Sequence, residues 1–191
     1  MEKQISAHQF PKVYEALDIS LSELGCVMLD LEPSIDLIKI GNEMESGKSL
    51  YYSGNKEYFW IDGFVGKNPH VTLLYGLLGP AIDYKQLIDE VLTGWELKTI
   101  EVESIGYFES PYKDEPYRCI IAHVKVTPKL LEGHNRLEFL PHINTFAGYK
   151  AHFTLAYVKK DKVSIDSIKN FSSLVGKKFN IKDKLNLGGN K

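Results

Sequence analysis

The sequence is poor in cysteine and carries little net charge. Its 191 residues include two cysteines, Cys26 and Cys119, which lie too far apart for a zinc-binding pattern and are too few for a disulfide framework. We therefore expect two free thiols in a reducing compartment and no metal site. The formal net charge of −2 gives no general attraction to duplex nucleic acid or to an anionic membrane, so any phosphate-binding surface must be local.

Long apolar runs are also missing. No stretch approaches the ~20 consecutive apolar residues of a membrane-spanning helix. The start, Met1-Glu2-Lys3-Gln4, leads into mixed polar sequence and lacks the basic and then apolar pattern of a secretion signal. We expect a cytoplasmic protein without membrane contacts, located in the host cytoplasm if it is viral.

What the chain does have is enough apolar sequence for a packed interior. Hydrophobic residues make up 43% and aromatic residues 12%, which argues against disorder. The length predicts one domain over 1–191, built from two related lobes. Periodicity and breaker residues predict strands over 24–31, 70–75, 97–107, 117–126, 152–157 and 178–187, and helices over 33–44, 84–92, 128–140 and 165–174.

A six-residue phrase occurs twice in the chain. It reads His70-Val71-Thr72-Leu73-Leu74-Tyr75 in the first copy and His152-Phe153-Thr154-Leu155-Ala156-Tyr157 in the second. Both copies are typical of buried strands, and side chains alternate faces along a strand. The His and Thr of each copy should therefore share one face, while Tyr75 and Tyr157 should lie in the core on the other.

Two such His-x-Thr strands resemble the signature of the 2H phosphoesterase superfamily. The flanking residues Asn68-Pro69-His70, Gly148-Tyr149-Lys150-Ala151-His152 and Tyr157-Val158-Lys159-Lys160 are most similar to the phage anti-CBASS branch, whose members cleave cyclic oligonucleotide messengers. The resemblance implies an α+β, bilobal 2H phosphoesterase-like fold. In that fold two largely antiparallel sheets flank a central groove and the helices lie on the outside.

The resemblance implies that His70, Thr72, His152 and Thr154 are catalytic. The chemistry agrees, because a ribose 2′-hydroxyl can attack its own phosphodiester when one imidazole takes a proton and another donates one. Two threonine hydroxyls can bind the non-bridging oxygens as charge builds there. No metal or cofactor is needed. One His-x-Thr alone would be an ordinary strand sequence, and the sequence leaves open which histidine is the base.

Substrate binding is less defined by the sequence. Nucleobases stack on aromatic rings, and a long segment over 45–69, rich in Gly and aromatic residues, is a candidate lid. The candidate binding residues are Trp60, Tyr107, Tyr112, Tyr117 and Lys150, each of which is equally well explained as an ordinary core or surface residue. In anti-CBASS relatives a neighbouring subunit can help to close the pocket, so a homo-oligomer is also compatible.

The other histidines and a phosphate-loop-like sequence receive no role. We expect His123 and His134 at the surface, His142 in a loop and His8 in a polar start. Gly47-Lys48-Ser49 resembles the end of a phosphate-binding loop, but the required earlier glycine is absent and the preceding segment is helical.

Three functions compete. The first is a metal-independent phosphodiesterase that cleaves 3′,5′-linked cyclic di- or trinucleotides in anti-CBASS immune evasion. The second is an enzyme acting on RNA ends, like the 2′,3′-cyclic phosphodiesterase and RNA-ligase-like relatives. The third is a non-catalytic sponge for a cyclic nucleotide, which would have no use for an acid–base pair.

Overall fold

The computed structural model describes residues 24–46, 49–144, 148–160, 169 and 171–188. The strands of this part are β1 (Gly25–Leu31), β2 (His70–Leu77), β3 (Thr99–Glu109), β4 (Tyr117–Val124), β5 (His152–Lys159) and β6 (Lys178–Gly188). Its helices are α2 (Ile35–Ser46), α3 (Lys85–Val91) and α4 (Pro128–Leu137), with short 3-10 turns η3 (Lys56–Tyr58), η4 (Ala81–Tyr84) and η5 (Ser172–Leu174).

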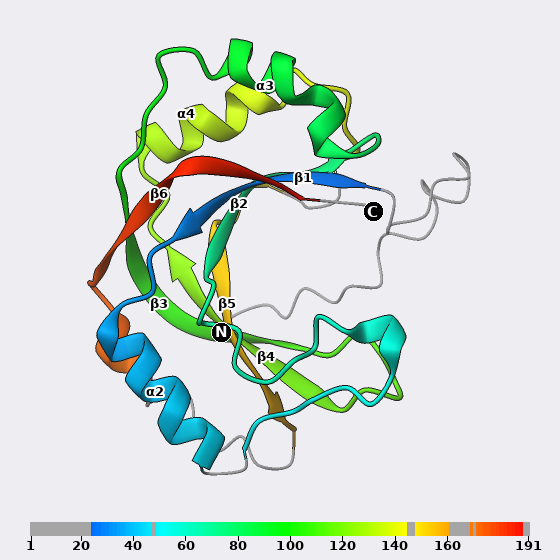
Figure 1. Ribbon diagram of the computed structural model, residues 1–191. Helices are drawn as coiled ribbons and strands as arrows, with labels where there is room; N and C mark the ends of the chain where they lie inside the picture. Colours follow the sequence, from blue (N-terminus) through cyan, green and yellow to red (C-terminus); the bar gives the residue numbers. More distant parts are fainter. Residues whose placement is uncertain (1–23, 47–48, 145–147, 161–168, 170, 189–191) are drawn as a thin grey trace.

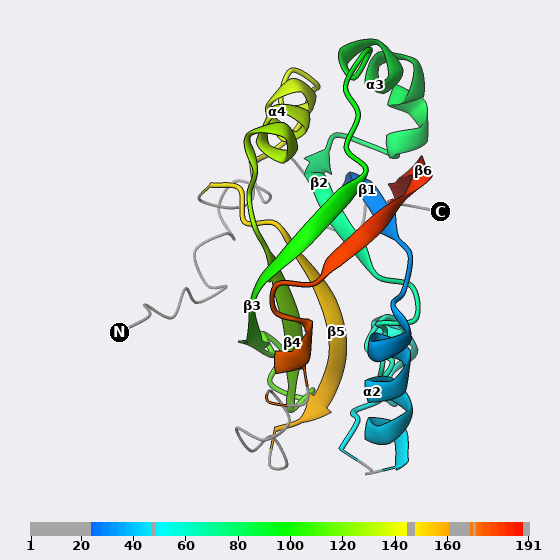
Figure 2. The ribbon, with the colours of Figure 1, turned by 90° about the vertical axis from the view of Figure 1, so that its left-hand side faces the viewer.

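The six strands form one sheet in the order β2-β1-β6-β3-β4-β5, with antiparallel neighbours throughout. It consists of two three-stranded halves, which are joined where the start of β6 pairs with the start of β3. Figure 2 shows these two strands side by side between the halves. The sheet is strongly curled (Figure 1), so that Cα atoms of β2 and β5, its two outermost strands, come within 8 Å of each other.

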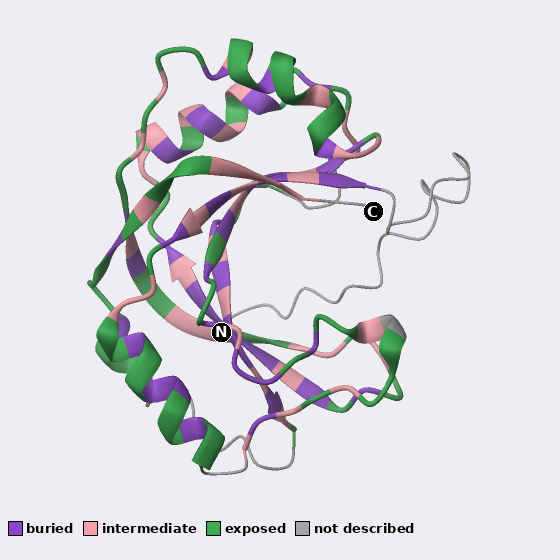
Figure 3. Ribbon diagram, in the orientation of Figure 1, coloured by how far each residue is buried: buried purple, intermediate pink, exposed green. Residues whose placement is uncertain are grey.

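The helices cover the outer side of the curled sheet. In Figure 1, α3 and α4 lie over the half that contains β1 and β2, and α2 lies beside the other half. Their buried residues face the sheet (Figure 3) and join one continuous apolar core with the outward-facing side chains of all six strands. The start of α4 is fixed by Thr127, whose side chain accepts a hydrogen bond from Leu130 N at 3.2 Å, and by Pro128 in the first turn.

The segment 49–66 runs along the outer edge of β5. Its backbone groups pair with β5 at Tyr51 N to Tyr157 O, 2.9 Å, and at Tyr157 N to Gly63 O, 2.7 Å. Glu115, in the loop between β3 and β4, holds the same segment because its carboxylate accepts hydrogen bonds from Tyr51 Oη and Ser53 Oγ, both at 2.8 Å. The edge of β5 is therefore covered rather than open to solvent.

The predicted α+β architecture with antiparallel strands is confirmed. The two predicted sheets are the halves of one continuous sheet, because β3 and β6 meet in the middle. Of the predicted helix over 165–174, positions 161–168 and 170 lie outside the described residues, and 172–174 forms a 3-10 turn. Among the described residues, no helix is long and apolar enough to cross a membrane.

Candidate active site

Each copy of the repeated phrase forms a motif strand, and both strands carry a β-bulge at the same place. In β2, Thr72 pairs with Met28 and Leu74 with Val27, so that Leu73 has no partner in β1. In β5, Thr154 pairs with Ile121 and Ala156 with Ile120, so that Leu155 is the extra residue. The two motif strands thus share a β-bulge directly after the threonine as well as their similar sequence.

The bulge overturns the prediction for the two tyrosines that end the phrase. An extra residue shifts the alternation of side chains by one position. Tyr75 therefore pairs with Cys26 on the same face as His70 and Thr72, and Tyr157 pairs with Cys119 on the same face as His152. Both tyrosines lie on the face of the motif residues rather than in the main core opposite to it.

We call the side of the sheet that carries the motif histidines the inner face. Paired residues of neighbouring strands point to the same side of the sheet, and side chains alternate sides along each strand. The pairings therefore identify the residues of each strand that lie on the inner face. They are Cys26, Met28 and Asp30 of β1, His70, Thr72 and Tyr75 of β2, Ser104, Gly106 and Phe108 of β3, Cys119, Ile121 and His123 of β4, His152, Thr154 and Tyr157 of β5, and Asn186 of β6.

The curl of the sheet brings the two motif histidines within electrostatic reach. His152 is half-buried, and burial is the main cause that lowers the pKa of its imidazole. A backbone hydrogen bond at Lys150 opposes this, while the nearby imidazoles of His123 and His70 lower the pKa further. His70 and His152 therefore interact although β2 and β5 stand at opposite ends of the strand order.

The two motifs are also linked by a direct hydrogen bond. Tyr149, three residues before His152, donates from Oη to the carbonyl oxygen of Thr72 at 3.0 Å. Its ring stacks on His134 at 4.0 Å between centroids and an interplanar angle of 13°. His134 Nδ1 in turn donates to the carbonyl of Leu73, the bulge residue, at 2.6 Å. The backbone of β2 is therefore held at the motif by Tyr149, which precedes β5, and by His134 of α4.

This arrangement corrects the expectation for His134, which does not lie free at the surface. Burial of the neighbouring phenol raises the pKa of Tyr149, which keeps it a hydrogen-bond donor. His134 belongs to α4, and its hydrogen-bond acceptor is the carbonyl of Leu73 in the distant strand β2. The sequence alone does not show this contact, so it could not distinguish His134 from a solvated helix residue. His142, in a loop as predicted, bonds locally to Leu140 O at 2.8 Å.

His152 lies among groups that fix its ring. Its Nδ1 bonds to the carbonyl oxygen of Lys150 at 2.9 Å. A carbonyl only accepts, so Nδ1 carries the hydrogen and Nε2 of the neutral ring is the nitrogen that can accept a proton. The ring of Phe108 meets the imidazole edge-on, with centroids 5.3 Å apart and an interplanar angle of 83°.

His123 is the cross-strand partner of His152 and belongs to the inner face. It is half-buried, and it lies on the more polar face of β4, as the alternation of its strand predicts. Gly106 of β3 makes room for this third imidazole, since a Cβ at that position would lie 2.8 Å from His123 Nε2. Any larger residue there would move the His123 side chain.

His70 has a different environment. It is exposed, and its cross-strand partner is the carboxylate residue Asp30 of β1. Directly opposed side chains in an antiparallel pair are neighbours on the same face. Asn186 of β6 donates from Nδ2 to Asp30 Oδ1 at 2.9 Å, which orients the carboxylate.

The two threonines share the inner face with the histidines, and both are half-buried. Thr154 Oγ1 accepts a hydrogen bond from Cys119 Sγ at 3.8 Å. Burial raises the pKa of the Cys119 thiol to about 11, so it remains a protonated donor at neutral pH. The Thr154 hydroxyl hydrogen then remains available for a further acceptor.

The sequence-predicted binding residues divide into two groups. Tyr112 and Trp60 are connected through Tyr58, with ring centroids 4.5 Å and 5.5 Å from it, and this aromatic group packs beside Tyr157 at the far end of the inner face. Lys150 is exposed, and its carbonyl contacts His152. These three lie on the side of the second motif.

Tyr107 lies on the outer face and is a correction to the prediction. It pairs with the core residue Ile120, and the Arg118 guanidinium lies 5.0 Å from its ring centroid. Alternation along β3 puts its neighbour Phe108 on the inner face instead, 48% exposed and against His152. Sequence reasoning missed Phe108 because only the register of β3 against β4 decides which of two adjacent aromatics faces the site.

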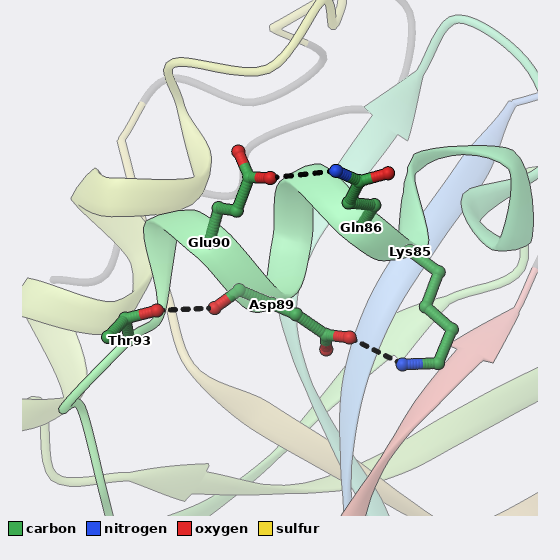
Figure 4. Close-up of a pocket in the computed structure, with 5 residues that line it drawn as sticks. All are labelled: Lys85, Gln86, Asp89, Glu90 and Thr93. Carbon is green, nitrogen blue, oxygen red and sulfur yellow. Dashed lines mark hydrogen bonds and ion pairs between the residues drawn. The ribbon is translucent and has the colours of Figure 1, made fainter.

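Two further observations concern binding elsewhere. In the part of the chain that the structure describes, no group of three or more His, Cys, Asp or Glu side chains could hold a metal ion. A surface hollow on α3, lined by Lys85, Gln86, Asp89, Glu90 and Thr93, is shown in Figure 4. Its side chains pair within one helix, as in Gln86 to Glu90 at 3.0 Å, which is the usual pattern of a solvated helix face.

No protein-family model matches the sequence, and no curated protein matches it. Solved structures do share its fold. Kluyveromyces marxianus Usb1 superposes with a TM-score of 0.52 and 10% identity, over 88% of this chain and 95% of that one. The same protein solved with uridine monophosphate gives a TM-score of 0.51 at 10% identity and the same coverage. This chain therefore has the 2H phosphoesterase fold.

Proposed function

We propose that this protein is a phosphodiesterase of the 2H type that cleaves a 3′,5′-phosphodiester at the end of single-stranded RNA. The observation that carries the proposal is the pair of His-Thr strands, which a curled sheet brings together on one inner face with matching bulges. The four catalytic residues would be His70, Thr72, His152 and Thr154. The fold shared with a protein solved with uridine monophosphate supports a nucleotide as the substrate.

The proposed reaction uses the substrate's own 2′-hydroxyl. One imidazole takes the hydroxyl proton, the 2′-oxygen bonds to phosphorus, and the bond from phosphorus to O5′ breaks as the other imidazole protonates that oxygen. The products are a 2′,3′-cyclic phosphate and a 5′-hydroxyl. Thr72 and Thr154 would donate hydrogen bonds to the non-bridging oxygens, where negative charge builds in the transition state.

The composition of the inner face supports a short substrate. The side chains that the strand pairings place on it are imidazoles, hydroxyls and aromatic rings together with the uncharged Cys26, Met28, Cys119, Ile121 and Asn186, and at these paired positions Asp30 is a carboxylate and none is Lys or Arg. A long nucleic acid backbone is bound mainly by cations that neutralise successive phosphates. A terminal dinucleotide, which presents one scissile phosphate and two bases, fits this surface better.

A cyclic di- or trinucleotide contains the same 3′,5′-phosphodiester bond and is the alternative substrate. The hypothesis that the protein cleaves cyclic messengers in immune evasion rests on the residues that flank the two motifs. The shared fold favours the RNA-end substrate over it. The host-cytoplasmic location and the homo-oligomer belong to the cyclic-nucleotide hypothesis and would gain support with it.

The test is a substrate panel with EDTA present throughout. Short single-stranded RNAs with different 3′ ends and a set of 3′,5′-linked cyclic nucleotides would be incubated with the protein, and products identified by mass spectrometry. We expect shortening of the linear RNAs with 2′,3′-cyclic phosphate on one product. Turnover of cyclic nucleotides alone would change the assigned substrate from RNA ends to cyclic nucleotides. Tight binding of a cyclic nucleotide without turnover would identify a sponge. Intact substrates across the panel, with folded protein, would refute the phosphodiesterase.

A further inference from the structure

The middle of the inner face carries an exposed aromatic ring beside the second motif. Phe108 belongs to β3, and 48% of its surface is exposed. Its ring meets the imidazole of His152 edge-on, with centroids 5.3 Å apart. Single exposed apolar residues are ordinary on protein surfaces, but this ring lies on the face of the motif residues and contacts one of them. The exposed surface of Phe108 is therefore next to the place where the proposed reaction occurs.

The imidazole of His123 lies in the same region and is not fixed by a hydrogen bond. His123 is half-buried and pairs with Ser104 of β3 on one side and with His152 of β5 on the other. Hydrogen bonds hold His134, His142 and His152, whereas the imidazole of His123 has no hydrogen-bond partner among the residues that the structure describes. A half-buried polar group of this kind usually binds water or a ligand.

Gly106 brings this imidazole next to Phe108. On the inner face of β3, Gly106 stands between Ser104 and Phe108. A Cβ at Gly106 would lie 2.8 Å from His123 Nε2 and 3.2 Å from its Cδ2, so the imidazole lies against this position. A glycine inside a strand often marks a place where another group approaches the backbone closely. Phe108 and His123 therefore belong to one region of the inner face, beside His152.

We infer that Phe108 and His123 form a subsite for the base of one nucleoside attached to the scissile phosphate. The inference rests on the proposed function and adds a binding site to it. A base has a π face that stacks on an aromatic ring and an edge that carries hydrogen-bond donors and acceptors. Phe108 supplies the ring, and a ring nitrogen of His123 can donate or accept a hydrogen bond. Because stacking tolerates any base, His123 is the residue that distinguishes one base from another.

Dinucleotides that lack one base test the stacking contact. Wild-type protein and Phe108→Leu would be compared on a dinucleotide with both bases and on two analogues, each with one base replaced by hydrogen. On the complete dinucleotide, Phe108→Leu should raise KM on the order of 10–100-fold, because the base loses its stacking partner. The value of kcat should be nearly unchanged, since the contact binds substrate and transition state alike. Removal of one of the two bases should abolish the difference in KM between the proteins.

Two variants of neighbouring chemistry serve as controls for Phe108→Leu. Phe108→Tyr keeps an aromatic ring and should retain the wild-type KM. Tyr107→Leu removes the adjacent aromatic residue, which is 43% exposed on the outer face, and should also leave KM unchanged. An equal loss of kcat in Phe108→Leu on all three substrates would show that the ring only supports His152. That result, or an unchanged KM on the complete dinucleotide, would overturn the subsite.

His123→Ala tests the discrimination between bases. Each of the four bases would be placed in turn on the nucleoside that the Phe108→Leu comparison identifies, and the ratio of the largest to the smallest kcat/KM would be measured. The loss of one hydrogen bond to the base should lower this ratio about two- to tenfold in His123→Ala. A ratio within one variant is insensitive to changes at His152 that affect every substrate equally. An unchanged ratio would overturn the role of His123.

Gly106→Ala tests the position of the imidazole without removing it. The added Cβ displaces His123 Nε2, so this variant should lower the same ratio as His123→Ala does. In the His123→Ala protein the substitution should have no further effect, because no imidazole is left to displace. Additive losses would show that Gly106 acts independently of His123 and would overturn their coupling. Failure of the subsite leaves wild-type turnover intact, whereas failure of wild-type protein on every dinucleotide would refute the proposed function itself.

Discussion

The two motif strands of this protein are nearly identical in sequence and differ in what surrounds them. Both present histidine, threonine and, after a bulge, tyrosine on one face. His70 is exposed and stands opposite a carboxylate, whereas His152 is half-buried between an imidazole and an aromatic ring. A repeated element can thus place the same functional group twice, while the neighbouring strands decide its burial and its neighbours.

The comparison shows that the asymmetry comes from the inner strands. Asp30 and His123 lie on β1 and β4, which are the partners of the motif strands in each half of the sheet. Neither belongs to a repeated phrase. The two copies of one strand sequence therefore stand in different surroundings because each copy pairs with a different neighbour.

The strongest test of the comparison removes each imidazole. His70→Ala and His152→Ala should each lower kcat/KM for a short single-stranded RNA by about 10²–10⁴-fold, because in the proposed reaction each removes a positioned acid or base. Thermal unfolding should change little, since neither side chain contributes to the apolar core. His142→Ala, which removes an imidazole that bonds to the nearby carbonyl of Leu140, is the control. A normal rate for either motif variant would show that the proposed site is not where the reaction occurs.

The threonines provide the next test. Thr72→Val and Thr154→Val keep the shape of the side chain and remove one donor to the non-bridging oxygens, so each should lower kcat by on the order of 10²–10³-fold. Cys119→Ala is the control for Thr154, since it removes the thiol that donates to the threonine oxygen and keeps the hydroxyl. It should leave kcat within about threefold of wild type if the thiol only orients the hydroxyl. A larger loss in Cys119→Ala than in Thr154→Val would assign the donor role to the thiol.

Much of the site could be predicted because strand alternation and a repeated phrase both appear in the sequence. The pairing of His70 with Thr72 on one face follows from a period of two residues. The positions of Tyr75 and Phe108 could not be predicted, because a bulge and a strand register depend on a partner strand that is distant in the chain. His123 and Asp30 were hidden for the same reason. Cross-strand neighbours follow from the register, and the register from the packed sheet.

Loss of the hydrogen bond between Tyr149 and the Thr72 carbonyl, which links the two motifs, should have a smaller effect on activity. Tyr149→Phe removes the donor to the Thr72 carbonyl and should cost about 0.5–1.5 kcal/mol in the free energy of unfolding. Because the bond fixes one motif relative to the other, kcat should also fall by up to about tenfold. Tyr84→Phe is the control, since its phenol donates to the Leu78 carbonyl at 2.8 Å, away from both motifs. Urea unfolding and kcat would be measured for both, and a loss of kcat in Tyr84→Phe as large as in Tyr149→Phe would assign the effect to general loosening.

The smallest expected effect is a shift in pH dependence, and it tests directly whether neighbouring groups lower the pKa of His152. Burial first, and then His123 and His70, hold the pKa of His152 below its ordinary value. A neutral His152 is able to take the 2′-hydroxyl proton in the proposed reaction, so the kcat/KM that depends on this ring should be retained on acidification and fall only below about pH 6.5, the ordinary value for an imidazole. The titratable groups that act on His152 are His123 from β4 and His70 from β2, while β3 contributes the uncharged ring of Phe108. His123→Gln removes one lowering influence and leaves burial in place, so the acidic midpoint should move upward by less than about one pH unit. A downward shift would mean that His123 stabilises the charged form of its neighbour, and the two motif strands would then differ less than their surroundings indicate.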